Sequence, residues 1–479
     1  MTEILTFSQC LHHLMKKYQF TATSLSTLIG GGKTELKKVL TDDSTEARRT
    51  ALYESLKNSR LFSQEDYEQM ETALEVSRIG SVQYQFQQDM RCILEDNLPL
   101  CSWPICLDSG ITLQERLQML SSAQKVEVIC FNCCFHSVMS VIKEHFSNPE
   151  KDISMFHFVH ADAFKGAASG FVSVVFPMLF DKRYKPYAVQ STAENRVHAI
   201  GGNILSIRAH YPTQSRQWTF FVVDAQQALE LESAEKADIF SFCSKALRSA
   251  APIMFPLKEI PAENEDFSSL CMNYLSHELN RATYSITNDL CFFQTPSDIA
   301  QSALIDKAMF SEADTKSLLD RTLAIHEQRY QNHYQKRKYT YQVMSFSGCE
   351  NFLKTGMFTD HFFGFRAFTL EERKRIFGEM LRCAREHRYF VPLLFKDHSF
   401  QCQYNLFCYE KLGVSFDKTD TDYDLRKGNR SIFLNFTEFT NQYLQFFTGT
   451  LVKTKCHSAE ESLALLEEMF SRFLVENNL

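Results

Sequence analysis

Apolar residues recur every three or four positions through roughly the first 95 residues, a spacing that predicts one helix after another. From about residue 125 the pattern changes to short apolar and aromatic runs, which suit buried strands. We expect such strands at residues 126–131, 153–159, 204–209 and 218–223. Helical stretches at 137–146 and 237–250 alternate with them, so this region predicts an α/β domain.

The pattern is helical again from 263 to 340, and alternation then returns. Strands are expected at 341–346, 390–395, 404–409 and 431–434, and helices at 370–388 and 458–474. The sequence therefore predicts a multidomain protein with an all-α N-terminal domain and a large α/β region. We place the domains at 1–95, 120–262 (first α/β unit), 263–340 (helical connector) and 341–479 (second α/β unit with a C-terminal helix). The alternation is compatible with two similar α/β units, but no residue-level repeat establishes a duplication.

Composition narrows the classes of function. A chain of 479 residues with 44% hydrophobic and 23% charged residues is typical of two or three globular domains. Its formal net charge of -7 confines any nucleic-acid contact to a local patch. The 15 cysteines are scattered, and no leader-like start or run of about eighteen apolar residues is present. We therefore expect a cytoplasmic protein with reduced thiols and no membrane segment.

Residues 22–40 have the pattern of two helices around one tight turn. Leu25 anchors the first helix, and Gly30 stands where the chain must turn with a left-handed backbone. Leu36 and Val39, three residues apart, hold the second helix. Its other side chains point outward, where a recognition helix would meet base edges and phosphates: Lys33, Thr34, Glu35, Lys37 and Lys38.

With supporting helices expected at 7–18, 46–58 and 64–78, this arrangement resembles the lambda-repressor-like, or Xre-type, family of DNA-binding domains over the first sixth of the chain. The resemblance implies that the second helix of the motif enters the major groove and that its lysines and Thr34 contact DNA. The chain departs from the family pattern in its three consecutive glycines at the turn and in Ser26, where alanine is commoner.

Local charge agrees with a contact surface on one face. Residues 12–60 contain nine lysines or arginines against five acidic residues, and the helix that follows is acidic. The alternative interpretation is a helical protein-interaction domain whose lysines form a solvated face. The run from Gly30 to Thr34 also mimics the end of a phosphate-binding Walker loop. We reject nucleotide hydrolysis, because that loop needs glycine in place of Thr27 and a strand in front of it.

Cys130, Cys133, Cys134 and His136 form the densest thiol cluster. A redox pair or part of a zinc site is one interpretation, since Cys-x-x-Cys at a helix start lowers a thiol pKa. No second cysteine pair lies nearby at metal-binding spacing, so core packing is the better interpretation and no metal or other cofactor is expected.

A basic and aromatic stretch precedes the second α/β unit. Its candidate anion-binding residues are His326, Arg329, His333 and Arg337, accompanied by Lys336, Lys338 and three tyrosines. A solvated helix face explains the same pattern. The pairs His277–Glu278 and Asp360–His361, with Arg366 and Glu438, are polar groups in apolar surroundings that could line a pocket, but their spacing dictates no reaction.

The order of strands and helices in the larger units resembles the phospholipase-D-like fold, which some regulators use as a sensor. Catalysis in that family needs His-x-Lys, and none of the 15 histidines here is followed two residues later by lysine. The resemblance therefore implies a domain that binds a ligand and does not cleave it. No residue of the chain is predicted to be catalytic.

Together these patterns predict a DNA-binding transcriptional regulator with a C-terminal region that senses a ligand or drives oligomerisation. Its expected partners are double-stranded DNA, a small-molecule or protein effector, and a second copy in a homodimer, because paired half-sites supply affinity that one small domain lacks. The alternative is an enzyme or effector whose N-terminal helices recruit a protein partner. A structural interaction protein, marked by an extended hydrophobic surface patch, is the third hypothesis.

Overall fold

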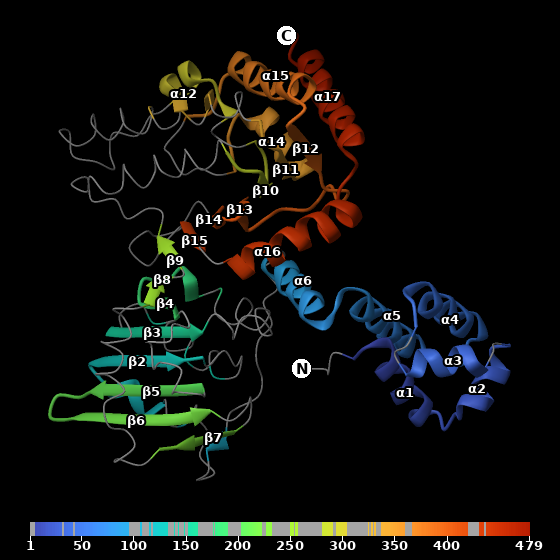
Figure 1. Ribbon diagram of the computed structural model, residues 1–479. Helices are drawn as coiled ribbons and strands as arrows, with labels where there is room; N and C mark the ends of the chain where they lie inside the picture. The colour runs from blue at the N-terminus through green and yellow to red at the C-terminus, as the bar shows by residue number, and fades with distance from the viewer. Residues whose placement is uncertain are drawn as a thin grey trace. The chain divides into compact units, whose positions relative to one another are not determined.

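The computed structural model divides the chain into two compact units, Met1–Asp89 (unit 1) and Met90–Leu479 (unit 2), which we describe separately (Figure 1). It describes residues 5–30, 33–41, 44–94, 106–107, 118–132, 152–160, 178–189, 203–222, 227–231, 250–252, 254–256, 280–290, 294–303, 337–359, 366–419, 431–434 and 437–479, with single residues or pairs between them at 115, 138, 142, 148, 176, 324, 327–328 and 330–331.

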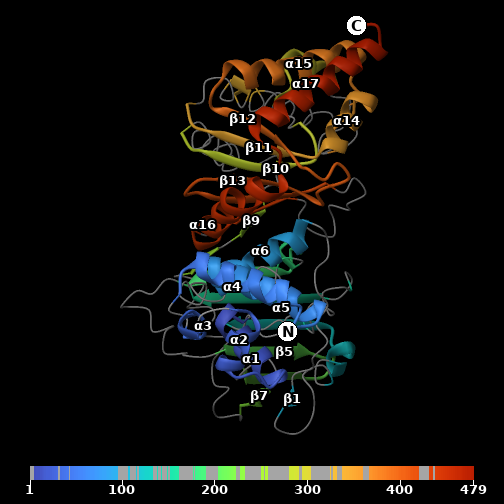
Figure 2. The same cartoon turned by 90° about the vertical axis from the view of Figure 1, so that its right-hand side faces the viewer.

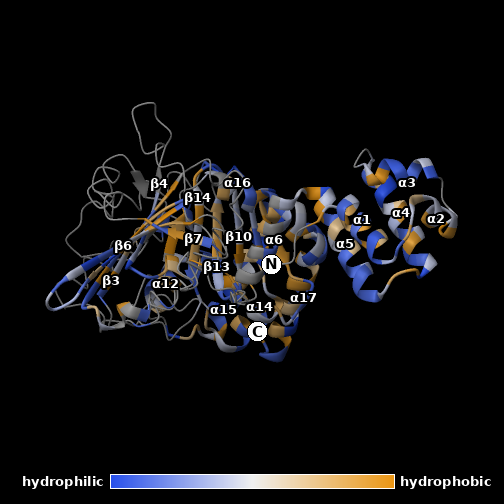
Figure 3. Cartoon of the chain, turned by 90° about the horizontal axis from the view of Figure 1, so that it is seen from below, coloured by the Kyte–Doolittle hydropathy of each residue, from blue (hydrophilic) through white to orange (hydrophobic). Residues whose placement is uncertain are grey.

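Unit 1 is helical in its described part. The helices are α1 (Phe7–Lys17), α2 (Ala22–Leu28), α3 (Lys33–Leu40), α4 (Glu46–Ser59), α5 (Gln64–Ile79) and α6 (Ser81–Leu94). Each of α1 to α5 carries both apolar and polar residues (Figure 3). The helices predicted at 7–18, 46–58 and 64–78 are therefore confirmed to within two residues. The boundary between the units falls inside α6 and not at residue 95, because this helix continues across it.

Side-chain caps explain where these helices start. Thr6, Thr21 and Ser63 each accept a hydrogen bond from a backbone N–H three residues later, and that residue's side chain bonds back. The apolar sides of the helices then form one core that includes Phe7, Leu11, Leu14, Leu25, Leu36, Val39, Leu56 and Met70. Burying side chains of this size contributes about 1.5 to 3 kcal/mol each.

Unit 2 contains two mixed sheets. The strands of the first sheet are β1 (Cys106–Leu107), β2 (Lys125–Phe131), β3 (Asp152–His160), β4 (Tyr184–Val189), β5 (Asn203–His210), β6 (Ser215–Val222), β7 (Gln227–Glu230) and β8 (Ala250–Pro252). Their order across the sheet is β1-β7-β6-β5-β2-β3-β4-β8. Strands β2, β3 and β4 are parallel, whereas β5, β6 and β7 follow on the other side of β2 as antiparallel neighbours.

The strands of the second sheet are β9 (Met254–Pro256), β10 (Thr283–Thr287), β11 (Thr340–Met344), β12 (Phe390–Leu394), β13 (Tyr404–Tyr409), β14 (Gly413–Lys418) and β15 (Ser431–Leu434). Their order is β12-β11-β10-β13-β14-β15-β9. Here β10, β11 and β12 are parallel, and β13, β14 and β15 follow as antiparallel neighbours on the other side of β10.

The two sheets thus share one topology: three parallel strands in chain order, then three antiparallel strands that return past the first. The prediction of two similar α/β units is confirmed at this level. The second unit begins earlier than expected, because β10 lies within residues 263–340, which the sequence pattern assigned to a helical connector. The strand is only five residues long, and three of them are threonine or serine, so its apolar signal is weak.

The second half of unit 2 also contains helices. Within the described residues they are α12 (Ser297–Ala303), α14 (Phe346–Thr355), α15 (Leu370–Glu386), α16 (Thr437–Phe446), the π-helical η5 (Phe447–Lys455) and α17 (Ala459–Glu476). Helices α14, α15 and α17 pack with β11 and β12 around Phe352, Phe377 and Leu466 (Figure 2). Phe176, from the segment between β3 and β4, contacts the rings of Tyr404 in β13 and Phe416 in β14 at 5.1 and 5.0 Å between centroids.

Candidate functional site

The candidate DNA-contacting helix is α3, and a tight turn positions it. Helix α2 ends at Leu28, and Gly30 has a φ of +64°, the left-handed conformation that glycine adopts at little cost. The predicted role of Gly30 in the turn is therefore confirmed. Gly31 and Gly32 lie outside the described residues.

Two apolar residues hold α3 against unit 1. Leu36 and Val39 are each 1% exposed and belong to the same core as Leu25 of α2. Ser26 is 6% exposed, and its hydroxyl donates to the Thr23 carbonyl at 2.9 Å. The hydroxyl is thus satisfied inside its own helix, so serine can be buried at this position.

The outer side of α3 carries the charges. Lys33, Thr34, Glu35 and Lys37 are exposed, and Lys38 is partly buried. Glu35 is paired, with Arg48 Nε at 3.3 Å and Lys38 Nζ at 3.9 Å. Among the described residues neither Lys33 nor Lys37 forms a salt bridge, so α3 presents two free cations that lie four residues, or about one helical turn, apart.

Asp66 is the buried ionic centre of unit 1, and sequence reasoning missed it. Its carboxylate is 1% exposed and accepts from Lys17 Nζ at 2.7 Å, from Tyr18 Oη at 2.5 Å and from Ser63 Oγ at 2.7 Å. Burial opposes ionisation, but these hydrogen bonds outweigh it and lower the pKa of Asp66 to about 2. Asp66 therefore ties α1 to α5 and has a structural role.

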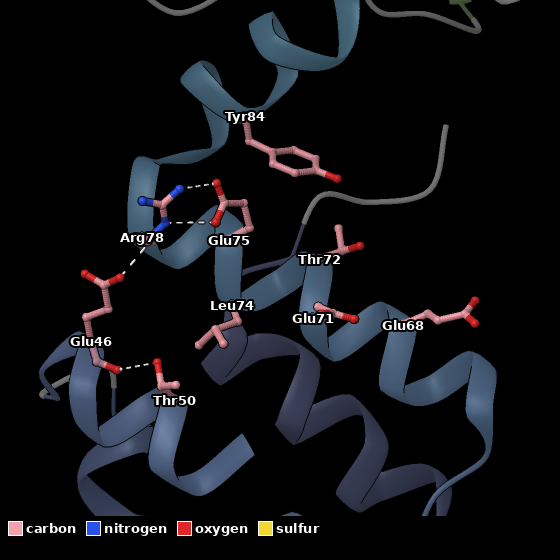
Figure 4. Close-up of a pocket in the computed structure, with 9 residues that line it drawn as sticks. All are labelled: Glu46, Thr50, Glu68, Glu71, Thr72, Leu74, Glu75, Arg78 and Tyr84. Carbon is pink, nitrogen blue, oxygen red and sulfur yellow. Dashed lines mark hydrogen bonds and ion pairs between the residues drawn. The ribbon is translucent and has the colours of Figure 1, made fainter. Parts of the chain in front are cut away.

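An acidic hollow of about 590 Å³ lies on the surface of unit 1 between α4, α5 and α6 (Figure 4). Its carboxylates are Glu46, Glu68, Glu71 and Glu75, and Arg78 is the cation that lines it. Arg78 bonds Glu75 at 2.5 and 2.8 Å and reaches Glu46 at 4.0 Å. Figure 4 shows Glu68 and Glu71 without such a partner among the side chains drawn.

Several candidate residues of unit 2 fall outside the described residues. They are Cys133, Cys134, His136, His277, Glu278, His326, Arg329, His333, Lys336, Asp360, His361 and the side chain of Glu438. Cys130 lies fully buried in β2, which agrees with core packing. Arg337 is exposed in front of β11. Arg366 forms a two-pronged ion pair with Glu372 at 2.7 Å for each contact, so that charge is used within the fold.

The described thiols of the second half are poorly suited to nucleophilic chemistry. Burial raises the pKa of Cys383 and of Cys456 to about 12, and it also raises the pKa of Cys349, Cys402 and Cys408. Within the part of the chain that the structure describes, no three His, Cys, Asp or Glu side chains gather as metal ligands would. None of the described helices combines the length and the apolar character needed to cross a bilayer.

Buried polar side chains lie at the carboxyl ends of β10 and β11, and sequence reasoning missed them as well. Asn288 donates to the Cys402 carbonyl at 2.8 Å and accepts from the Cys402 N–H at 2.6 Å. Asp289 accepts from the N–H and hydroxyl of Thr359 at 2.6 and 2.9 Å. Asn288 and Asp289 are 2–3% exposed, so they tie loops together and are closed to a ligand.

An open hollow of about 750 Å³ between α12, α15 and α17 is lined mainly by paired charges. Asp298 pairs with Arg375 at 2.5 Å, and Arg382 pairs with Glu379 at 2.7 Å. Its ionic groups satisfy one another, so it lacks the convergent free polar groups of a binding pocket.

Comparison with known proteins adds no identification. No family model matches the sequence, and no curated protein matches it. One similar solved structure is a polyphosphate kinase from Porphyromonas gingivalis, 10% identical with a TM-score of 0.19, covering 67% of this chain and 45% of that one. Another is a phosphatidylserine synthase from Haemophilus influenzae Rd KW20, 8% identical with a TM-score of 0.24, covering 82% and 98%.

This chain therefore spans less than half of the kinase's length. Scores this low decide neither fold family nor activity. The helix-turn-helix and phospholipase-D-like resemblances stay predictions.

Proposed function

We propose that the chain is a transcriptional regulator, and not an enzyme, whose unit 1 binds double-stranded DNA through α3. The observation that carries this proposal is the two-sided character of α3. Leu36 and Val39 are each 1% exposed, whereas Lys33 and Lys37 are exposed and unpaired among the described residues. A recognition helix needs one side that holds it on the domain and another that meets the groove.

The charged and polar residues of α3 are expected to make different contacts with DNA. Lys33 is its first residue and Lys37 lies one turn later, so both can reach phosphates or guanine edges while Thr34 between them contacts a base. Lys38 shares Glu35 with Arg48 and contributes less. Because the net charge of the chain is -7, affinity depends on this local face.

The test is selection of the full chain against a random pool of double-stranded DNA, followed by mobility-shift titration of the enriched duplexes at two salt concentrations. We expect enrichment of discrete sequences and binding that weakens as salt rises. The variant Lys33→Ala with Lys37→Ala should bind at least tenfold more weakly and reduce the salt slope by about 2, one unit for each phosphate that is no longer neutralised.

The matched control is Lys16→Ala with Lys57→Ala, which removes the same charge from α1 and α4. Both lysines lie in the last turns of helices other than α3, so binding should change less than threefold. The proposal is overturned if wild type enriches no sequence or if the control weakens binding as much as the α3 variant. Circular dichroism of each variant separates a weakened DNA interface from an unfolded domain.

The proposal includes a homodimer, with unit 2 as the ligand-sensing or oligomerisation region. A two-fold dimer reads two half-sites, so the enriched duplexes should be inverted repeats with centres about 10 base pairs, or a multiple of that, apart. Single half-sites without symmetry would argue for monomeric binding. Sedimentation of the free protein measures the dimer independently.

The second candidate is an enzyme or effector whose unit 1 recruits a partner. The acidic hollow between α4 and α5 favours it, since Glu68 and Glu71 would attract a lysine- or arginine-rich peptide. For this candidate, Glu68→Gln with Glu71→Gln weakens binding of an oligo-lysine peptide severalfold at low salt. For the DNA-binding regulator the same variant leaves duplex affinity unchanged, so the two measurements distinguish the candidates.

A further inference from the structure

Five cations gather at one end of the second sheet. The strand register places the first residues of β12, β11 and β10 side by side, with Thr340 opposite both Phe390 and Thr283. The β13–β14 hairpin turns at the same end, where Tyr409 lies opposite Thr283 and Gly413. Just beyond this row lie the residues that we call the cationic end: Arg281, Arg337, Lys338, Arg388 and Lys411.

The cationic end contrasts with several paired arginines elsewhere in the second half. Elsewhere Arg366, Arg375, Arg382 and Arg385 each pair with a carboxylate at 2.5 to 2.7 Å. Among the described residues no salt bridge includes a member of the cationic end. The acidic residue next to the cationic end in these strand ends is Glu410, so positive charge predominates there.

Two of these cations are held in place by contacts that leave their charge uncompensated. Arg281 Nη1 donates to the backbone carbonyl of Glu410 at 2.7 Å. The guanidinium of Arg388 lies 4.6 Å from the centroid of the Tyr389 ring and donates to its hydroxyl. Guanidinium groups positioned this way retain further N–H donors for an oxyanion.

A stack of tyrosines ends in this surface. Tyr284 stacks on Tyr341 at 5.4 Å between centroids, and Tyr341 stacks on Tyr339 at 5.6 Å. Tyr389 meets Tyr339 edge to face at 5.5 Å. Tyr339 nevertheless stays 45% exposed. Its ring is therefore held rigidly beside the cations, so stacking a partner on it would cost little conformational entropy.

We propose that the cationic end, with Tyr339, binds single-stranded nucleic acid, whose phosphates meet the cations while a base stacks on Tyr339. Neighbouring strands lie about 4.8 Å apart, so the row from β12 to β14 spans roughly 19 Å. That length exceeds what one mononucleotide fills and matches several consecutive phosphates. An exposed aromatic ring favours a single strand, because base faces in a duplex are covered by their neighbours.

This inference does not rest on the function proposed for unit 1. The experiment uses the full chain carrying Lys33→Ala and Lys37→Ala, which removes the α3 contribution, and measures fluorescence anisotropy with a labelled oligo(dT) of about 15 nucleotides. Duplex DNA of the same length and a labelled mononucleotide are the competing probes. We expect the oligonucleotide to bind most tightly, and an equal or tighter affinity for duplex or mononucleotide overturns the proposal.

Variants separate charge from stacking. Tyr339→Ala should weaken oligo(dT) binding about tenfold because one base no longer stacks, whereas Tyr339→Phe keeps the ring and should stay within about threefold. Arg337→Ala with Lys338→Ala should lower the salt slope by about 1.4, since each phosphate of a single strand that is neutralised contributes about 0.7 to that slope.

The matched charge control is Lys396→Ala with Lys455→Ala. The N–H of Lys396 bonds the Lys455 carbonyl at 2.8 Å just beyond the carboxyl end of β12, so both lie at the opposite end of that strand. Their removal should leave the salt slope unchanged. Equal effects of the two double variants, or equal effects of Tyr339→Ala and Tyr339→Phe, contradict the proposed surface.

Discussion

The two sheets of unit 2 share one topology but treat charge in opposite ways at the same end. At the amino end of β2, Glu127 binds Lys125 at 3.0 Å, His210 at 3.1 Å and Arg208 at 4.0 Å. At the corresponding end of β10, in the second sheet, the cationic end has no such carboxylate in a salt bridge among the described residues. The same strand order therefore carries a paired ionic cluster in the first sheet and cations without a salt bridge, among the described residues, in the second.

This difference shows that one strand order can present either paired or unpaired charges at the same end of a sheet. The strand order determines which residues lie together at one end of a sheet. A single glutamate determines whether the cations there form salt bridges within the fold. The sheets also differ in their buried polar groups. The middle parallel strand of the first sheet buries His157, which can titrate, whereas that of the second buries Gln342, which cannot.

The largest expected effect concerns the opposite, closed end of the second sheet. A Cβ added at Gly348 of α14 would lie 2.1 Å from the backbone oxygen of Asn288, and this buried residue just after β10 cannot move away cheaply. Gly348→Ala should lower the free energy of unfolding by about 3 kcal/mol, measured by urea denaturation followed by circular dichroism.

Gly378→Ala is the matched control for this prediction. Gly378 lies inside α15, and the added Cβ would make ordinary contact with the Phe470 ring at 3.5 Å. Because alanine favours helix over glycine, this variant should be about 0.5 to 1 kcal/mol more stable than wild type. Equal destabilisation by the two substitutions would show that Gly348 of α14 does not lie against Asn288 as described.

The second prediction separates the two buried polar groups by pH. His157 is fully buried beside the Tyr184 hydroxyl at 2.8 Å, and burial lowers the pKa of its imidazole from 6.5 to about 3. Below pH 6.5 the unfolded chain therefore binds a proton at this histidine, whereas the folded chain does not. The free energy of unfolding falls as the pH decreases. The decrease in the free energy of unfolding should reach about 2 kcal/mol at pH 5.

His157→Gln provides the comparison, because glutamine places at this site the residue type that the second sheet already buries. The variant is expected to be less stable at pH 7, since the contact with Tyr184 changes. Between pH 7 and pH 5 its stability should nevertheless fall by about 2 kcal/mol less than that of wild type. If the free energy of unfolding falls equally in the variant and in wild type between pH 7 and pH 5, the titrating group is not His157.

Sequence patterns predicted the larger elements because their apolar signals are strong. The runs at 126–131, 153–159 and 404–409 correspond to β2, β3 and β13, and the amphipathic stretches at 370–388 and 458–474 correspond to α15 and α17. Short or polar strands were missed. Both β10, with three hydroxyl-bearing residues, and β4, which contains Pro186, lack the apolar run that marks a buried strand.

The two proposed binding surfaces differ in how far the sequence reveals them. The residues of α3 are consecutive, so their pattern is visible in the chain. The cationic end joins Arg281, Lys338, Arg388 and Lys411, which lie up to 130 residues apart and meet only through the strand register. A tyrosine and basic pattern at 330–339 was the one local signal of this surface.

The smallest expected effect tests the comparison of the two ends directly. Glu127→Gln keeps the size of the side chain but removes the charge that holds Lys125, Arg208 and His210 in the first sheet. Burial opposes ionisation of Glu127, yet bonds from His210 and Lys125 lower its pKa, so the carboxylate stabilises the fold above pH 4.5. Because the group is about a quarter exposed, its removal should cost only about 1 kcal/mol of stability.

The informative measurement on this variant is oligo(dT) binding in the Lys33→Ala and Lys37→Ala background. If free cations alone made a nucleic-acid surface, Glu127→Gln would create a second one and tighten binding severalfold. We expect a change of less than twofold, since the aromatic stack that ends in an exposed ring belongs to the second sheet. A large gain in affinity would show that free positive charge is sufficient for binding. In that case Tyr339→Ala should leave oligo(dT) binding unchanged.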